Sequence, residues 1–188
     1  MWGRGRTDHA GLDDHALLVR AASGDERAAA ALVDRLGPRA LASAQRLLGS
    51  RAEAEDVVQE GFLRLWRKGA DWDAGGAARP GTWLHRVVHN LALDRLRRAG
   101  AAWDELDDAL PDAGPGVEAW LMAAERAEAL EAALAALPPR QRAAVVLRHV
   151  EGYANPEIAA MLGCGVEAVE SLTARGKRAL RRMLEETP

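Results

Sequence analysis

Residues 52–68 read AEAEDVVQEGFLRLWRK, and the rest of the chain is interpreted around this stretch. On a helix of about 3.6 residues per turn, its apolar and charged side chains separate onto opposite sides. Leu63 falls on the charged side, where a leucine has no core to fill. A charged face with an exposed leucine predicts a docking surface, and a merely solvated face is the alternative. The apolar side holds Val58, Gly61, Phe62, Leu65 and Trp66, and the charged side holds Glu53, Asp56, Glu60, Arg64 and Arg67, with Gln59 at its edge.

Length and composition favour a helical protein of one domain or two small ones. The 188 residues are rich in Ala, Leu, Arg and Glu, and no alternating strand pattern is visible, so we expect an all-α fold. Six acidic residues and no Lys or Arg lie between residues 101 and 124. The net charge of −3 is unusual for a DNA-binding protein that acts alone.

Several classes of protein are disfavoured by the sequence. A single cysteine, Cys164, excludes an intrachain disulfide framework, and the absence of a long apolar run or signal-like segment predicts a cytoplasmic protein without membrane insertion. His85 and His89 are four residues apart, but no third ligand lies near them in the sequence, so we expect no metal. We also expect no catalytic residues and no cofactor, because no nucleophile–base pair or paired carboxylates stand out.

Capping residues and Gly/Pro pairs divide the first half of the chain into helices. Asp13 or Asp14 can cap a helix that runs to about Ala22, and Asp25 can cap the next. Gly37-Pro38 is expected to end that helix at Leu36 and to start another that reaches about Leu48.

Residues 82–98, TWLHRVVHNLALDRLRR, predict a further helix with a distinctive outer stripe. Basic, amide and imidazole groups on one stripe suit contacts with phosphates and base edges, and an ordinary solvated face is the alternative. The predicted inner side holds Trp83, Leu84, Val87, Val88, Leu91 and Leu96, and the outer stripe holds Thr82, Arg86, His89, Asn90, Leu93 and Arg97.

The C-terminal part predicts a helix-turn-helix after helices over 121–137 and 140–150. Asn155 can cap a short helix, Gly163-Cys164-Gly165 supplies a turn, and a basic helix runs from Val166 to about Leu184. DNA binding is the favoured interpretation, and a three-helix bundle with a basic edge is the alternative. The predicted inward set is Ile158, Ala159, Leu162, Val166, Val169, Leu172, Gly176 and Leu180, and the outward set is Glu167, Glu170, Ser171, Ala174, Arg175, Arg178 and Arg182.

AEDVVQEGFLRLW resembles the core-polymerase-binding helix of the extracytoplasmic-function (ECF) branch of the sigma-70 family of bacterial sigma factors. In that family the helix binds a coiled coil on the clamp of the largest RNA polymerase subunit. The resemblance implies that this contact is made by Asp56, Gln59, Glu60, Leu63 and Arg64.

The helix over 82–98 resembles the family's promoter-melting and minus-ten-recognition region. There, a base of the non-template strand is flipped into a pocket built by the loop before the helix, which corresponds to residues 79–82. This loop departs from the commoner Asp-Pro-x-x-Gly form, so the resemblance does not imply which base is captured. The residues implied in minus-ten binding are Arg79, Thr82, Arg86, His89, Asn90, Arg97 and Arg98.

Residues 137–180 resemble the family's minus-thirty-five-recognition domain. Glu170 and Leu172 depart from the basic residues that many members carry on either side of Ser171, so the family's usual promoter sequence is not implied. The residues implied in minus-thirty-five binding are Glu170, Ser171, Ala174, Arg175, Lys177 and Arg178.

Together, the three motifs imply an ECF-type sigma factor that is not an enzyme. Its expected organisation is a region 2 domain over 10–99, an acidic linker over 100–116 and a region 4 domain over 117–188. Its expected partners are core RNA polymerase, through the clamp coiled coil and the flap, promoter DNA and an anti-sigma factor. Two alternatives remain from the residues: a dimeric helix-turn-helix regulator that binds DNA without polymerase, and a catalytic helical bundle.

Overall fold

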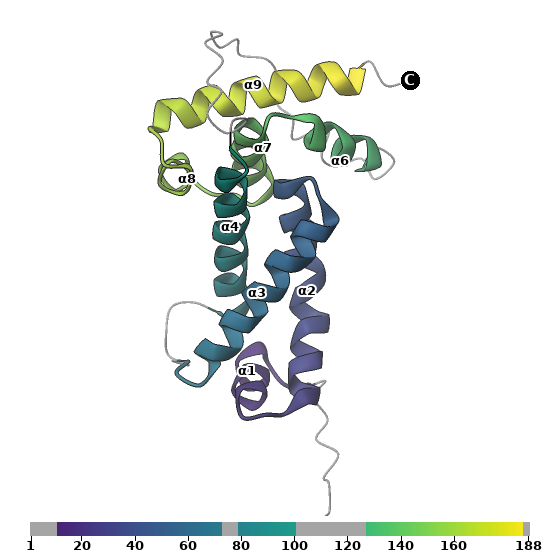
Figure 1. Ribbon diagram of the computed structural model, residues 1–188, viewed down its shortest axis with the longest axis vertical. Helices are drawn as coiled ribbons and strands as arrows, with labels where there is room; N and C mark the ends of the chain where they lie inside the picture. Colours follow the sequence, from purple (N-terminus) through teal and green to yellow (C-terminus); the bar gives the residue numbers. More distant parts are fainter. Residues whose placement is uncertain (1–10, 73–78, 101–126, 186–188) are drawn as a thin grey trace, which may run out of the picture.

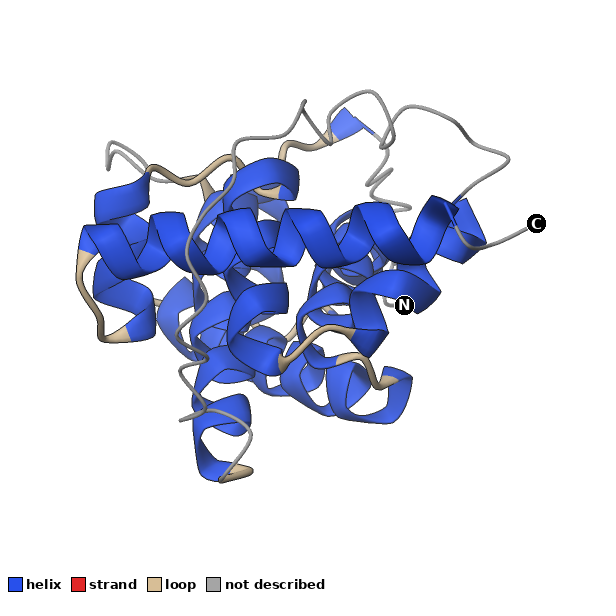
Figure 2. Cartoon of the chain, turned by 90° about the horizontal axis from the view of Figure 1, so that it is seen from above, coloured by secondary structure: helices blue, strands red, loops and turns tan. Residues whose placement is uncertain are grey.

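The computed structural model describes residues 11–72, 79–100 and 127–185, and every regular element within these ranges is helical (Figure 2). Four helices form domain one: α1 (Asp14–Ala22), α2 (Glu26–Leu48), α3 (Arg51–Gly69) and α4 (Pro80–Arg98). The helices between residues 127 and 185 form domain two, which lies across one end of α2 and α4 (Figure 1). The expected acidic linker over 100–116 falls almost entirely outside the described residues. Within the described residues, no helix combines the length and hydropathy needed to cross a bilayer.

The predicted caps of the first two helices are confirmed. The Asp13 carboxylate accepts a hydrogen bond from the Ala16 N–H at 2.7 Å at the start of α1. The Asp25 carboxylate accepts from the N–H groups of Arg27 and Ala28 at 3.1 and 3.2 Å at the start of α2. These carboxylates bond otherwise unpaired amides and favour the positive end of the helix dipole.

The prediction that Gly37-Pro38 interrupts the second helix is wrong, because α2 continues through Pro38 to Leu48. Proline removes one backbone donor, but Pro38 and Asp34, whose carbonyl would have accepted it, both lie on the exposed side. Leu32 and Ala40, on either side of the proline, are fully buried. Burial of both halves in one core favours a continuous helix over a break.

The helix expected over 52–68 is α3, and its predicted apolar side packs against α2 and α4. Val58, Phe62 and Leu65 are buried, whereas Leu63 is 38% exposed. Gly61 permits a close approach of α4, because a Cβ there would lie 2.8 Å from Val88 Cγ2. The small residue thus brings α4 directly onto the helix that carries the predicted docking face.

Domain two consists of α6 (Ala127–Ala136), α7 (Pro139–Val145), a π-helical turn η4 (Val146–Val150), α8 (Asn155–Leu162) and α9 (Val166–Glu185). The helix expected over 140–150 therefore changes to π-helical geometry at Val146. The Gly163 turn is confirmed, with φ of +66° at Gly163, a conformation that favours glycine.

Two details of the predicted helix-turn-helix are wrong. Ala154, not Asn155, occupies the position before α8, and its N–H donates to the Glu157 carboxylate at 3.0 Å. Val166 was expected to point inward but is 40% exposed, because it is the first residue of α9 and precedes the buried stripe. The rest of the expected inward set is buried: Ile158, Ala159, Leu162, Val169, Leu172, Gly176 and Leu180.

The two domains are joined through Arg142, a residue of α7 that is only 6% exposed. Its guanidinium donates to the carbonyl oxygens of Leu47 at 2.9 Å, Leu48 at 3.0 Å and Ala135 at 2.8 Å. Leu47 and Leu48 end α2, where carbonyls have no partner within the helix and carry the negative end of its dipole. A cation of domain two therefore caps a helix of domain one.

Candidate functional site

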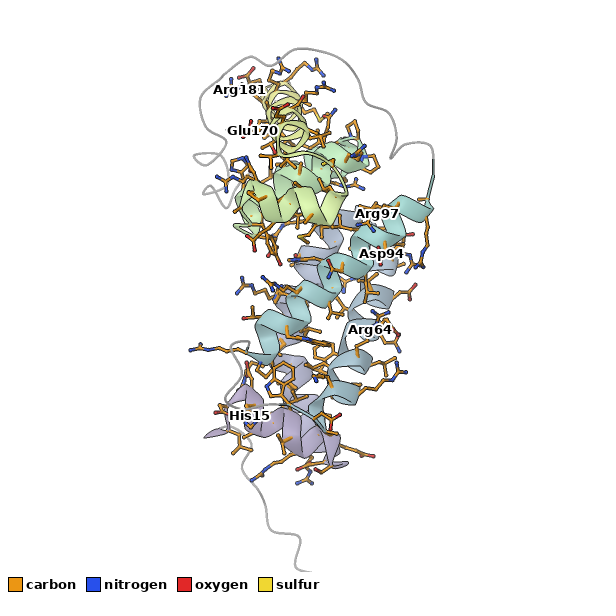
Figure 3. The ribbon with its side chains drawn as sticks, turned by 90° about the vertical axis from the view of Figure 1, so that its left-hand side faces the viewer. His15, Arg64, Asp94, Arg97, Glu170 and Arg181 are labelled. Atoms are coloured by element: carbon orange, nitrogen blue, oxygen red, sulfur yellow. The ribbon has the colours of Figure 1, made fainter. Side chains whose placement is uncertain are left out.

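The charged face of α3 presents the five side chains predicted to contact a partner. Asp56 Oδ2 lies 3.1 Å from Arg95 Nη2 of α4, and Glu60 Oε1 lies 2.8 Å from Arg64 Nε. These pairs are largely exposed, so they contribute little to stability and can be exchanged for contacts with a partner. Figure 3 shows Arg64 pointing away from the helical core.

An apolar groove of about 640 Å³ opens between α2 and α3, beside this face. Gln59 and Leu63 belong both to the charged face and to the groove wall. An apolar hollow edged by charged and amide groups suits the side of a helix that carries both kinds of side chain. The groove is lined by Val33, Asp34, Gly37, Pro38, Leu41, Glu55, Val58, Gln59, Phe62, Leu63 and Trp66.

The predicted outer stripe of α4 is only partly exposed. Thr82, Arg86, Asn90, Arg97 and Arg98 are exposed, as is Arg79 immediately before the helix. Two predicted members of the stripe are not: His89 is 1% exposed and Leu93 is fully buried. Leu93 belongs to the hydrophobic core, whereas His89 is covered by a polar cluster that includes residues of domain two.

A cavity of about 460 Å³ lies where the N-terminal half of α4 meets domain two. It brings together four of the predicted minus-ten residues: Arg79, Thr82, Arg86 and His89. Domain two contributes Glu151, Gly152, Tyr153 and Glu157 to its wall. The cavity is therefore polar and carries both cationic and acidic groups.

Four side chains from both domains form a hydrogen-bonded relay across this interface. Ser43 Oγ donates to Glu151 Oε1 at 2.6 Å and lies 2.7 Å from His89 Nε2. His89 Nδ1 lies 3.0 Å from the Tyr153 hydroxyl. Ser43 and His89 belong to domain one, and Glu151 and Tyr153 to domain two.

The proton positions in the relay follow from counting donors. Since the single Ser43 hydroxyl proton goes to Glu151, Ser43 Oγ must accept from His89 Nε2–H. Burial lowers the pKa of His89 to about 4, an effect that Glu151 opposes and that His85 and Arg39 reinforce. His89 is thus neutral, and its bare Nδ1 accepts from the Tyr153 hydroxyl. The 3.8 Å separation of His89 Nε2 and Glu151 Oε2 is therefore not an ion pair.

His85, His89 and Glu151 bring three possible metal-ligand atoms within 4.8 Å of one another. The sequence offered no third ligand for this histidine pair, because Glu151 comes from the other domain. Both ring nitrogens of His89 are already hydrogen-bonded, so a cation would have to displace Ser43 or Tyr153. The donor set therefore fits an interdomain hydrogen-bond network better than a metal site.

The predicted recognition residues on α9 form one surface of domain two. Glu170 is exposed, and its Oε1 accepts from Asn155 Nδ2 of α8 at 3.4 Å. Figure 3 shows Glu170 and Arg181 on α9, at the end of the molecule opposite His15. The remaining residues of the prediction are partly buried: Ser171, Ala174, Arg175, Lys177 and Arg178.

Sequence reasoning missed Ser43, Arg142, Glu151 and Tyr153. Ser43 stands in the alanine-rich stretch ALASAQRLL without any motif, and Glu151 and Tyr153 follow a helix in a segment that reads as a loop. Their partners lie in the other domain, so no spacing along the chain could reveal them. Only Arg142 carried a signal, because it directly precedes the apolar run AAVVL in an expected helix, and an arginine that is buried there needs acceptors.

Comparisons with known proteins identify both domains. The Sigma-70 region 2 family matches residues 32–102, and the Sigma-70 region 4 family matches residues 127–180. The ECF RNA polymerase sigma factor SigE of Mycolicibacterium smegmatis is 38% identical over 173 residues, which cover 87% of this chain and 65% of SigE. The chain therefore spans just under two thirds of SigE.

A second relative is matched over nearly its whole length. RNA polymerase sigma factor NccH of Alcaligenes xylosoxydans xylosoxydans is 35% identical over 179 residues, which cover 92% of this chain and 95% of NccH. Sigma factor RpoE of Bartonella quintana, solved in complex with the anti-sigma factor NepR, matches with a TM-score of 0.55 and 22% identity, covering 83% of this chain and 96% of RpoE. This structural likeness concerns the fold alone. With region 2 and region 4 both present in order, the chain belongs to the ECF branch of the sigma-70 family of RNA polymerase sigma factors, which are not enzymes.

Proposed function

We propose that this chain binds core RNA polymerase through α3 and directs it to specific promoters. The observation that carries the proposal is the face of α3 beside the apolar groove, where Asp56, Gln59, Leu63 and Arg64 are exposed and Glu60 is half-buried. A clamp coiled coil carries charged and apolar side chains along a helix. The charged residues of α3 can pair with the former, and the apolar groove can hold the latter. Leu63, 38% exposed at the edge of the groove, is the apolar anchor of this contact.

In this proposal α4 and the residues before it bind the minus-ten element. Arg86, Arg97 and Arg98 supply cations for phosphates, and Asn90 supplies an amide for a base edge. Arg79 and Thr82 are exposed at the start of α4, where they can contact a base flipped out of the duplex. His89 is part of this set only when domain two leaves it accessible.

Domain two reads the minus-thirty-five element with α9 and contacts the polymerase flap. Arg175, Lys177 and Arg178 lie within about one turn of the helix that follows the Gly163 turn, and Glu170, Ser171 and Ala174 lie in the turns before them. Arginine can pair with guanine edges, and Glu170 can accept from a cytosine amino group. The proposed organisation is region 2 over 10–99, an acidic linker over 100–116 and region 4 over 117–188.

An anti-sigma factor is the proposed regulator, acting in the cytoplasm, where the polymerase works. The groove between α2 and α3 offers such a protein an apolar binding surface next to the face proposed to contact the polymerase. An anti-sigma factor bound in this groove would compete directly with the polymerase clamp for α3.

Co-elution of the full chain with core polymerase that lacks a sigma factor tests the proposal. We expect a stable complex, and expect it to weaken when Asp56→Arg and Glu60→Arg are combined. Glu26→Arg combined with Asp71→Arg is the matched control, because both residues are exposed on domain one outside the predicted contact set. Failure of the unsubstituted chain to co-elute would contradict the proposed docking function.

A further inference from the structure

The charge on α9 changes sign along the helix. Glu167 and Glu170 are exposed in its first two turns, whereas Arg175, Lys177 and Arg178 follow them. In a helix-turn-helix, the N-terminal residues of the second helix reach the base edges in the major groove, and cations are the usual partners of the phosphates. The part of α9 placed to contact base edges therefore carries carboxylates, and the basic residues lie further along.

Helix stability does not account for Glu170. The helix dipole favours a carboxylate in the first turn, as at Glu167, but its effect falls off beyond that turn. Thr173 and Ala174, three and four positions further on, cannot form an ion pair with Glu170. Within the described part of the chain, Glu170 forms no salt bridge, and its hydrogen-bond partner is Asn155. On a surface proposed to bind a polyanion, a base contact is the interaction that can offset the repulsion between this carboxylate and the phosphates.

Asn155, the first residue of α8, holds one oxygen of the Glu170 carboxylate. Asn155 Nδ2 donates to Glu170 Oε1 at 3.4 Å, and the described residues provide no hydrogen bond to Glu170 Oε2. Asn155 is half-buried, and α8 lies beside the N-terminal end of α9 (Figure 1). Fewer rotamers are open to a side chain that is held in this way, so less entropy is lost when Oε2 binds a further donor.

We propose that Glu170 reads cytosine at one position of the minus-thirty-five element and that Asn155 is a positioning residue for this contact. The proposal rests on the minus-thirty-five role of α9 proposed above. In the major groove, cytosine presents the N4 amino donor, whereas guanine presents two acceptors and thymine presents an acceptor and a methyl group. Adenine also presents an amino donor, but its N7 acceptor lies beside that donor and repels a carboxylate. A carboxylate therefore favours cytosine over the other three bases.

Of the two departures from the family pattern beside Ser171, only Glu170 is placed to change the sequence that is read. Leu172 is 3% exposed and belongs to the hydrophobic core, so it cannot reach a base. A basic side chain at position 170, which many family members carry, would donate to guanine O6 and N7. Glu170 accepts where that side chain donates, so we expect this chain to reject promoters that carry guanine at the corresponding position.

A promoter library with a randomised minus-thirty-five element tests the preference. The full chain is combined with core polymerase, and each template carries a barcode in its transcribed region, so sequencing of the transcripts measures initiation from every template. We expect templates with cytosine at one position to give about tenfold more transcript than templates with guanine there. Initiation that depends on the minus-thirty-five sequence without a cytosine preference at any position would overturn the proposal. Initiation that ignores this sequence altogether would overturn the proposed minus-thirty-five role of α9, and the cytosine contact with it.

Substitutions of Glu170 then assign the contact. Glutamine pairs with adenine and arginine with guanine, so we expect the preferred base at this position to become adenine in Glu170→Gln and guanine in Glu170→Arg. Preferences at the other positions should not change. Glu185→Gln removes a carboxylate from an exposed position at the other end of α9 and is expected to keep the cytosine preference. A cytosine preference that persists in both Glu170 variants would overturn the assignment.

Asn155→Ala tests the positioning role. The carboxylate of Glu170 remains but is no longer held, so we expect the cytosine preference to fall from about tenfold to about threefold, with the other positions unaffected. Asn155→Asp, which keeps the shape but lacks the amide donor, is expected to show the same loss. Circular dichroism checks that each variant keeps its helical content. A preference that remains about tenfold, or a loss spread evenly over all positions, would overturn the positioning role.

Discussion

The guanidinium of Arg142 in domain two donates to the carbonyl oxygen of Leu47 in domain one at 2.9 Å. This contact lets a buried cation replace the missing hydrogen-bond donors at the end of α2. Gly49 fits the same corner, because its φ is +71° and a Cβ there would lie 2.9 Å from Arg142 Nη1. The end of α2 is thus built to receive a residue of the other domain.

Replacing Arg142 by methionine is expected to lower the free energy of unfolding by about 2–4 kcal/mol. The change keeps most of the buried volume but leaves the carbonyls of Leu47 and Leu48 buried without donors. Urea unfolding followed by circular dichroism measures the effect. Arg67→Met, on the exposed face of α3, is the control and is expected to change stability by less than about 0.5 kcal/mol. A loss for Arg142→Met no larger than the control would contradict the capping role.

Stability is expected to fall as the pH is lowered from 6.5 toward 4. The pKa of His89 is about 4 in the folded protein against 6.5 in the unfolded chain, so the unfolded state binds more protons in this window. The stabilisation is complete above 6.5 and is lost as the pH falls toward 4, by at most about 3 kcal/mol. Glu151 opposes the shift, and His85 and Arg39 reinforce it.

Urea titrations at several pH values measure this effect, with His89→Gln as the comparison. Carboxylates elsewhere also titrate below about pH 5, so the difference between the two proteins is the relevant quantity. We expect a shallower slope for His89→Gln between pH 6.5 and 4. Identical slopes would mean that His89 does not change its protonation on unfolding in this range.

Charge reversal at Asp56 and Glu60 is expected to weaken binding to core polymerase by about tenfold or more, because two favourable contacts become repulsive. The side chain of Asp56 is 64% exposed, so the fold should tolerate the change. Fluorescence anisotropy with labelled protein gives the affinity, and circular dichroism checks the helical content. Unchanged affinity would show that these residues of α3 do not contact the polymerase.

Arg175→Ala is expected to weaken recognition of the minus-thirty-five element by about tenfold, the usual scale for losing an arginine contact to a base edge. Binding to core polymerase should not change. Arg148→Ala, at an exposed position of domain two outside the predicted DNA-binding set, is the control. Transcription from promoters with altered minus-thirty-five sequences measures the effect. Loss of core binding in Arg175→Ala would show that this part of α9 contacts the polymerase.

Local pattern predicted most of the helices and their buried faces. The α3 register followed from the periodicity that buries Phe62 and exposes Leu63, and the caps followed from Asp13 and Asp25. The break at Pro38 was predicted wrongly, since local propensity at one exposed turn is weaker than burial of Leu32 and Ala40 on either side. Tertiary packing therefore determines that α2 continues through Pro38.

The relation between the domains could not be predicted from the sequence. A helical wheel placed His89 outside because the wheel considers only one helix, whereas Tyr153 and Glu151 bury it from the other domain. The role of Ser43 could not be predicted for the same reason, because its partners His89 and Glu151 are distant in sequence. The predicted DNA-binding residues Arg86 and Arg97 were found on the expected helix, but their contacts with α8 were not foreseen.

Run-off transcription with core polymerase measures whether this chain directs initiation to specific promoters. The full chain, core polymerase and a pool of genomic fragments would be combined, and the 5′ ends of the transcripts would be mapped. We expect initiation at a defined set of sites that share minus-ten and minus-thirty-five elements, and we expect this initiation to be lost in the Asp56→Arg, Glu60→Arg variant. Transcripts no different from those of core polymerase alone would contradict the proposed function.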